Sequence, residues 1–290
     1  MHGNSSICRF CNRLPQSKFR LGEIGQSDQQ ARFSPSWAAA LFSDGPDASG
    51  LERAMTASLA GWSELVFAFA LFITSHMIPA RPVARAWLLR HMGKPAYLVA
   101  YTVLSILVFG WLILAANRAP YLPLWEPAAW QMWITNIAMP FVCLLLAYGI
   151  AAPNPLSIAS RNDTTYDPDH PGIVGCTRHP VLWAATLWAS AHVPPNGDLA
   201  HVIVFCLFAV LGVFGALIVD IRKQRLFGTA EWLRLSVRTS FVPLVALFSG
   251  RWLPSLDHLN FVRLLAATVL YFSFLMLHEI VIGVSPLPPL

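Results

Sequence analysis

The residues of this sequence that can do chemistry are ionisable side chains lying within or beside long apolar stretches. Such side chains are costly in an apolar setting, so each is a candidate functional residue. Neutral imidazole is tolerated there and is also a good metal ligand, so the histidines are the strongest candidates. The full set is Glu64, His76, Arg178, His179, His192, His201, Asp220, His278 and Glu279.

Two histidines have surroundings that fit either a packing or a cofactor role. His76 ends an apolar stretch, where it is either a polar helix-end residue bonded to a neighbour or an axial haem ligand. In the fourth predicted apolar stretch Ala185, Ala189 and His192 share one helix face at spacings of four and three. Small residues beside a histidine leave room for a flat macrocycle, but they serve close helix packing equally well. Spacing alone does not decide between these interpretations.

Arg178-His179-Pro180 stands where an apolar helix is expected to begin. Proline suits the first helical turn because it lacks the amide proton that would go unpaired there. Arg178 and His179 can then hold an anion or a cofactor carboxylate at the helix N-terminus. Charge anchoring at a membrane interface explains the same residues, and both interpretations stay open.

Three other motifs favour structural explanations. Cys8 and Cys11 have metal-ligand spacing, but no second ligand pair follows them. Asp167-Pro-Asp169-His170-Pro171 is typical of a rigid turn rather than a ligand set. The basic, aromatic stretch 228–243 indicates a loop of a membrane protein, so no nucleic-acid partner is expected.

The elements that must position these residues are apolar helices. Hydrophobic residues make up 56% of the chain and charged residues only 12%, about half the usual charged share of a soluble domain. We therefore predict an all-α fold, a polytopic transmembrane bundle of about six helices in a lipid bilayer. The predicted spans are Leu59–Ile78, Tyr97–Ala116, Trp130–Ile150, a short one at Pro180–Val193, Leu199–Ile221 and Val262–Gly283.

Basic residues set the predicted orientation. Lys and Arg gather in the loops 79–96, 151–179 and 222–256, which places these loops on the cytoplasmic side. Residues 1–54 are polar and are expected to form a disordered tail, leaving 55–290 as the transmembrane domain. Met55 directly precedes the first span, so we expect either that the protein starts there or that the tail is dispensable.

Between about Leu59 and Trp252 the sequence resembles the NnrU family of bacterial membrane proteins. The resemblance rests on Ser75-His76 followed by a basic Pro-Ala-Arg-Pro, and on the segments 171–180, 187–193 with 196–198, and 238–243 with 250–251. It implies a multi-pass protein of the bacterial inner membrane. It also implies an accessory or redox role beside the nitrite and nitric oxide reductase systems of denitrification.

Plant 15-cis-zeta-carotene isomerase is similar to this family, and the likeness implies haem b between His76 and His192. Arg178 and His179 are further candidate cofactor contacts because of their place at a helix N-terminus. It also implies an alternative function, haem-dependent cis-trans isomerisation of a polyene. The isomerase has a cysteine where this sequence has Ala189. Over about 175–243 the chain also resembles isoprenylcysteine carboxyl methyltransferases, which implies S-adenosylmethionine-dependent methyl transfer as a third candidate.

The predicted topology leaves the partner of His76 open. Two axial ligands of one iron must lie at the same depth in the membrane. His76 and His179 are both expected near the cytoplasmic face, yet His192 is expected roughly 20 Å beyond His179 along the helix. The resemblance favours His192 as the partner of His76, whereas depth favours His179.

Overall fold

A computed structural model describes residues 48–79, 81–160, 165–255 and 259–288 of the chain. The chain divides into two compact units, residues 1–59 and residues 60–290. Within the described residues all regular elements are helices and none is a strand, which confirms the predicted all-α fold. Residues 1–47, with Cys8 and Cys11, lie outside the described residues.

In the part of the chain that the structure describes, five helices are long and apolar enough to cross a membrane. A sixth, α7, has only 13 residues, as the short fourth predicted span suggested. Two single-turn helices, α6 and α9, complete the described elements. The five long helices are α3 (Ala48–Met77), α4 (Pro82–Arg118), α5 (Ala129–Gly149), α8 (Leu199–Ser236) and α10 (Phe261–Ile282); the short ones are α6 (Ile173–Cys176), α7 (Pro180–His192) and α9 (Val245–Phe248).

Several helices extend beyond the predicted boundaries. Helix α3 begins at Ala48, inside the segment expected to be a disordered tail. The loops predicted at 79–96 and 222–256 are largely helical, since α4 begins at Pro82 and α8 continues to Ser236. Gly93 (φ 75°) and Gly228 (φ 74°) break these two helices, and a positive φ is readily adopted only by glycine. These breaks let each long helix change direction without ending.

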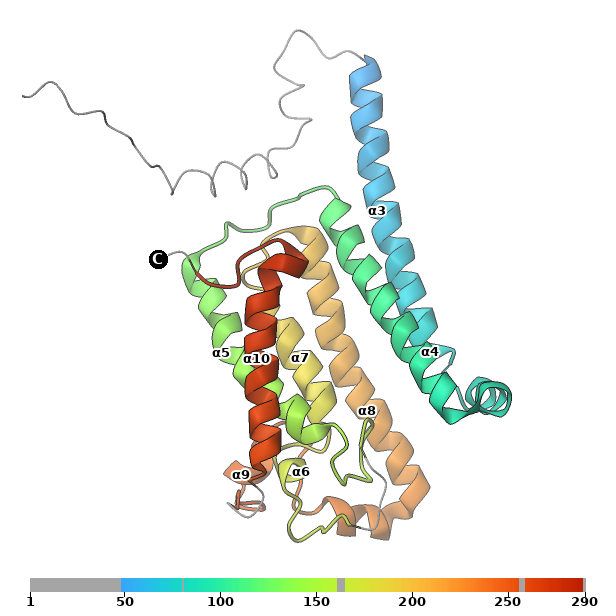
Figure 1. The fold of residues 1–290 in the computed structure, drawn as a ribbon, viewed down its shortest axis with the longest axis vertical. Coiled ribbons are helices and arrows are strands. Elements are labelled where there is room, and N and C mark those ends of the chain that lie inside the picture. The colour runs from blue at the N-terminus through green and yellow to red at the C-terminus, as the bar shows by residue number, and fades with distance from the viewer. Residues whose placement is uncertain (1–47, 80, 161–164, 256–258, 289–290) are drawn as a thin grey trace, which may run out of the picture. The chain divides into compact units, whose positions relative to one another are not determined.

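Within residues 60–290 the short helix α7 lies at the centre of the bundle. It packs against α5 on one side and α8 on the other, while α10 covers α5 and α4 packs on α8 (Figure 1). Leu65 of α3, Leu112 of α4 and Val204 of α8 belong to one buried cluster, which ties these three helices together.

Close packing of α7 against α8 depends on Gly212. A Cβ at this position would lie 2.2 Å from Thr186 Oγ1 and 3.0 Å from the carbonyl oxygen of Leu182. Ala216, one turn further on, is fully buried. Small residues at positions 212 and 216 therefore let the two helices pack closely.

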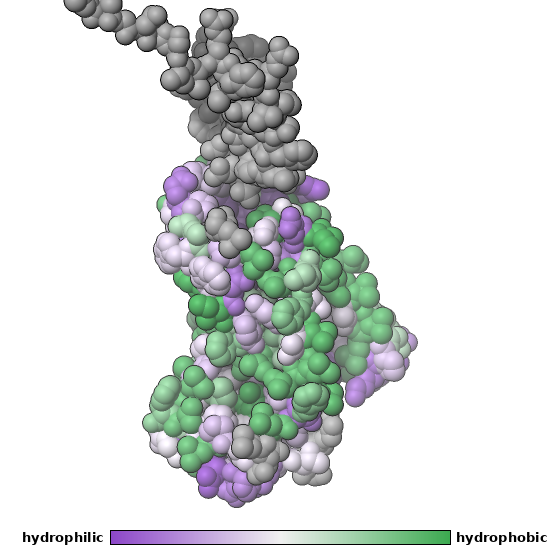
Figure 2. All heavy atoms as spheres, turned by 60° about the vertical axis from the view of Figure 1, so that its left-hand side comes forward, coloured by the Kyte–Doolittle hydropathy of each residue, from purple (hydrophilic) through white to green (hydrophobic). Residues whose placement is uncertain are grey.

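An apolar surface surrounds the bundle. Figure 2 shows green, hydrophobic side chains over the middle of the visible face and purple, hydrophilic ones toward its ends. Exposed large hydrophobics are found on all five long helices, among them Phe67, Ile106, Phe141, Phe214 and Ile280. The chain is therefore a multi-pass membrane protein whose surroundings are a lipid bilayer.

Candidate functional site

A buried ion cluster stands at the entrance of α7. Arg178 donates from Nη2 to Oδ2 of Asp220 at 2.7 Å and from Nε to both carboxylate oxygens at 3.2 Å. His179 Nε2 lies 2.7 Å from Asp220 Oδ1. Asp220 belongs to α8, so the cluster fastens the start of α7 to the middle of that helix. A carboxylate in so apolar a helix is stable there because it is paired and hydrogen-bonded.

The second ring nitrogen of His179 is also engaged. Its Nδ1 lies 2.8 Å from Ser157 Oγ, and the side chain has no exposed surface. Asn154 donates from Nδ2 to the carbonyl of Arg178 at 2.9 Å and accepts from the amide of Leu156. Loop 151–160 and helix α8 therefore hold the imidazole from two sides.

The turns that follow α8 close the cluster. Arg178 donates its amide proton to the carbonyl of Ser240 at 2.8 Å, and Thr177 donates from Oγ1 to the carbonyl of Phe241 at 2.9 Å. The guanidinium carbon of Arg178 lies 5.5 Å from the centre of the Trp232 ring. The guanidinium of Arg178 is thus held on Asp220 through Nε and Nη2, and an anion at the mouth of α7 would have to compete with that carboxylate.

Sequence reasoning singled out Asp220 but gave it no partner, and it missed Ser157, Asn154 and Ser240. For Asp220 the sequence did contain a usable signal for its partner. A carboxylate inside an apolar helix requires a cation nearby, and Arg178 precedes the neighbouring apolar helix. The polar loop residues carried no such signal, because their contacts join segments separated by more than twenty positions.

His76 lies in the last turn of α3. Its Nδ1 lies 2.8 Å from the carbonyl oxygen of Phe72, one turn earlier, and 3.3 Å from Ser75 Oγ. Its ring packs on the Phe72 ring at 4.1 Å and meets Tyr101 of α4 at 5.8 Å. A carbonyl only accepts, so Nδ1 carries the proton and Nε2 keeps its lone pair.

His192 ends α7 with the same arrangement. Its Nδ1 lies 2.7 Å from the carbonyl oxygen of Trp188, four residues earlier. The imidazole stacks on Phe205 of α8 with 5.2 Å between ring centres. On the small-residue face predicted beside it, Ala189 is fully buried while Ala185 is exposed. Nε2 of His192 again has no hydrogen-bond partner among the described residues.

Aromatic rings connect the two histidines. The ring of Phe72, on which His76 packs, lies 5.0 Å from the ring of Phe208 on α8. The ring of Phe208 in turn lies 5.9 Å from that of Trp188, which is beside His192. Phe72 therefore meets α8 at Phe208, only three residues beyond Phe205, on which His192 stacks. Adding the turn from Phe72 to His76, the two histidines differ in depth by about two helical turns, roughly 10 Å. This depth difference is about half of the roughly 20 Å that was expected from the length of α7.

Three of the other ionisable candidates have structural partners. Glu64 Oε1 accepts from Arg118 Nη1 at 2.9 Å, and His278 Nδ1 lies 2.7 Å from the carbonyl oxygen of Val284. The ring of His201 contacts Asp198 through Nδ1 and Asn117 through Nε2, and so joins the start of α8 to the end of α4. Burial opposes ionisation of Asp198, but the bonds from His201 outweigh it and lower the pKa of this carboxyl.

The polar turn 167–171 is confirmed as a turn. The amide of Asp169 donates to Asp167 Oδ1 at 2.9 Å, and Asp169 Oδ1 accepts from Arg238 Nε at 3.1 Å. Among the described residues, no group of three or more His, Cys, Asp or Glu side chains is arranged to hold a metal ion.

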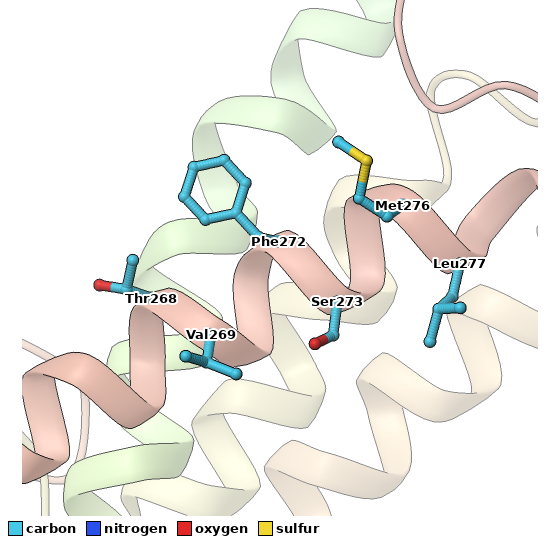
Figure 3. A pocket seen from close by; sticks show the side chains of 6 residues that line it. All are labelled: Thr268, Val269, Phe272, Ser273, Met276 and Leu277. Carbon is cyan, nitrogen blue, oxygen red and sulfur yellow. The ribbon is translucent and has the colours of Figure 1, made fainter.

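One open groove lies on the outer side of α10. Figure 3 shows its lining side chains along a single helix: Thr268, Val269, Phe272, Ser273, Met276 and Leu277. None of them ionises near neutral pH, so the groove offers no group for acid–base or nucleophilic chemistry.

Comparison with known proteins identifies the family. No curated protein and no solved structure matches the chain. The family model described as NnrU protein matches residues 64–286, which is most of the chain and includes both the ion cluster and the two histidines. The chain therefore belongs to the NnrU family.

Proposed function

We propose that the protein binds haem b between His76 and His192 and serves as an accessory or redox factor in nitrite and nitric oxide reduction. The observation that carries the proposal is the shared state of the two imidazoles. Each donates a hydrogen bond from Nδ1 to the carbonyl oxygen four residues earlier, which leaves Nε2 available as a ligand. A hydrogen bond from the ring nitrogen that does not bind the metal is the usual way in which a metal-binding histidine is oriented.

The residues present fit haem in donor chemistry and in polarity. Two neutral imidazoles are suitable axial ligands, and the surroundings are aromatic and apolar. The rings of Phe72, Phe208 and Trp188 now fill the space between the ligands. Binding would therefore require these rings to turn aside and the two histidines to reach the same depth. Bound haem would supply a one-electron couple, and this chain would orient it and exclude water.

In this proposal the ion cluster is a support for the ligand helix. Arg178 and His179 fix the first turn of α7 to Asp220, and α7 carries His192 at its other end. The cluster gives less support to methyl transfer from S-adenosylmethionine, because both residues already bond to Asp220. The proposed setting is the bacterial inner membrane, with the basic loops in the cytoplasm and a nitrite or nitric oxide reductase as partner.

The test is the absorption spectrum of the purified full-length protein produced with added haem precursor. A Soret band of a six-coordinate low-spin haem is expected, and His76→Ala or His192→Ala should each convert it to a five-coordinate form. His91→Ala is a matched control. Its Nδ1 also lies 2.8 Å from the carbonyl oxygen four residues earlier, and its ring packs on Trp87 at 4.4 Å.

Absence of a Soret band, or spectra of His76→Ala and His192→Ala that match His91→Ala, would refute haem binding. The aromatic lining also suits a long apolar polyene, so isomerase activity is the second candidate. Cells that supply 9,15,9′-tri-cis-zeta-carotene separate the two roles, because only the isomerase would change the isomer profile.

A further inference from the structure

The first eleven residues of α4, Pro82–Met92, form a separate helical segment. Gly93 has φ 75° and ψ 163°, which no helix contains, so the segment leaves the line of the remaining helix (Figure 1, teal). Without this break, the 37 residues of α4 would measure about 55 Å. The bilayer core is only about 30 Å thick, and the part after Gly93 is long enough to cross it. The first segment need not enter the core.

The cations of this segment and of the residues that flank it have no protein partner among the described residues. Arg81, Arg85, Arg90 and Lys94 are exposed, and the sequence from 79 to 96 contains no Asp or Glu. None of the four makes a side-chain hydrogen bond or ion pair within the described residues. By contrast, Arg118, Arg178, Arg234 and Arg238 each pair with a carboxylate. The segment therefore presents a cluster of uncompensated positive charge.

Exposed apolar side chains lie among these cations. Val83 is 83% exposed and Trp87 is 60% exposed. Together with Ile78, Ala84 and Leu88 they line an open groove that also includes Arg81. Tryptophan is enriched at the level of lipid headgroups, where its ring is half in an apolar and half in a polar setting. Arginines beside it would lie at the depth of the phosphates.

We propose that Pro82–Met92 is an interfacial helix that binds anionic phospholipid of the surrounding membrane. Its apolar residues lie against the acyl chains, and Arg85 and Arg90 contact lipid phosphates. The partner must be anionic because the segment carries only positive charge, and it must be a lipid because the groove is apolar. This inference is independent of haem binding. A basic segment at the membrane surface contributes about a fivefold change in lipid affinity for each cation.

The experiment uses the full-length protein in vesicles of phosphatidylcholine that contain, at equal mole fraction, either brominated phosphatidylglycerol or brominated phosphatidylcholine. Quenching of Trp87 is obtained as the difference between the unaltered protein and Trp87→Phe. Brominated phosphatidylglycerol should quench Trp87 more strongly, and high salt should reduce this preference. In R85Q/R90Q the preference should fall by about fivefold for each arginine removed.

R234Q/R238Q is the matched control, because it removes the same charge from exposed arginines that already pair with Glu231 and Asp169. It should keep the preference for phosphatidylglycerol. Four results would overturn the proposal: equal quenching by the two lipids, a preference unaffected by salt, no quenching of Trp87 by either lipid, or an equal loss in the control variant.

Discussion

Replacing Asp220 by Asn removes the only negative charge of the cluster at the mouth of α7 and leaves Arg178 uncompensated. Both partners are largely enclosed, with 15% and 16% of the side chains exposed. Removing one member of a buried ion pair costs about 3–5 kcal/mol, because the other charge stays buried. Asn can still accept from His179, so the lower end of about 3 kcal/mol is expected. For a chain of this size that corresponds to a fall in Tm of roughly 6–12 °C.

The assay is thermal unfolding of the detergent-solubilised protein, followed by tryptophan fluorescence. Glu231→Gln is the control, because it breaks an arginine–carboxylate pair that is exposed on both sides. Its Tm should match that of the unaltered protein. The double variant Arg178→Met with Asp220→Leu removes both charges and should melt above Asp220→Asn. A Tm of Asp220→Asn equal to that of Glu231→Gln would refute the supporting role of the cluster.

Two further changes test the packing of the bundle and its response to pH. Gly212→Ala brings a Cβ against Thr186 and should destabilise the protein by about 1–3 kcal/mol, whereas Gly110→Ala, with no atom nearby, should raise or keep Tm in the same melting assay. Asp198 has a lowered pKa, so its stabilising contact with His201 is present above the ordinary pKa of 3.8 and is lost as the carboxylate protonates at lower pH. Asp198→Asn should therefore flatten the acid limb of stability plotted against pH; an unchanged limb would contradict this assignment.

Hydropathy determined most of the fold. A run of about twenty apolar residues can be stable in lipid only as a helix whose backbone groups bond internally, so span positions follow from composition alone. The boundaries were less predictable. Pro82 and Arg225 lie in basic stretches that look like loops, yet the helices continue through them and turn at Gly93 and Gly228. Glycine two residues before Pro95 was a local signal for the first of these breaks.

The candidate site was only partly accessible from the sequence. Local spacing identified His76, His192, Arg178 and His179 as unusual, because ionisable groups in apolar stretches are rare. Their partners could not be identified in the same way. Asp220 lies more than forty positions from Arg178, and only the packing of α7 on α8 brings the two side chains together.

The sequence by itself determined that this is a multi-pass helical membrane protein with histidines at two helix ends. Tertiary structure decided which histidine of α7 keeps a ring nitrogen without a hydrogen-bond partner among the described residues. His179 and His192 both lie on α7, but Ser157 and Asp220 occupy both nitrogens of His179, whereas His192 keeps Nε2 free beside Phe205. The physical reason is that hydropathy depends on each residue and its neighbours in the chain. The state of an imidazole depends on which donors and acceptors the packed helices place within 3 Å of it.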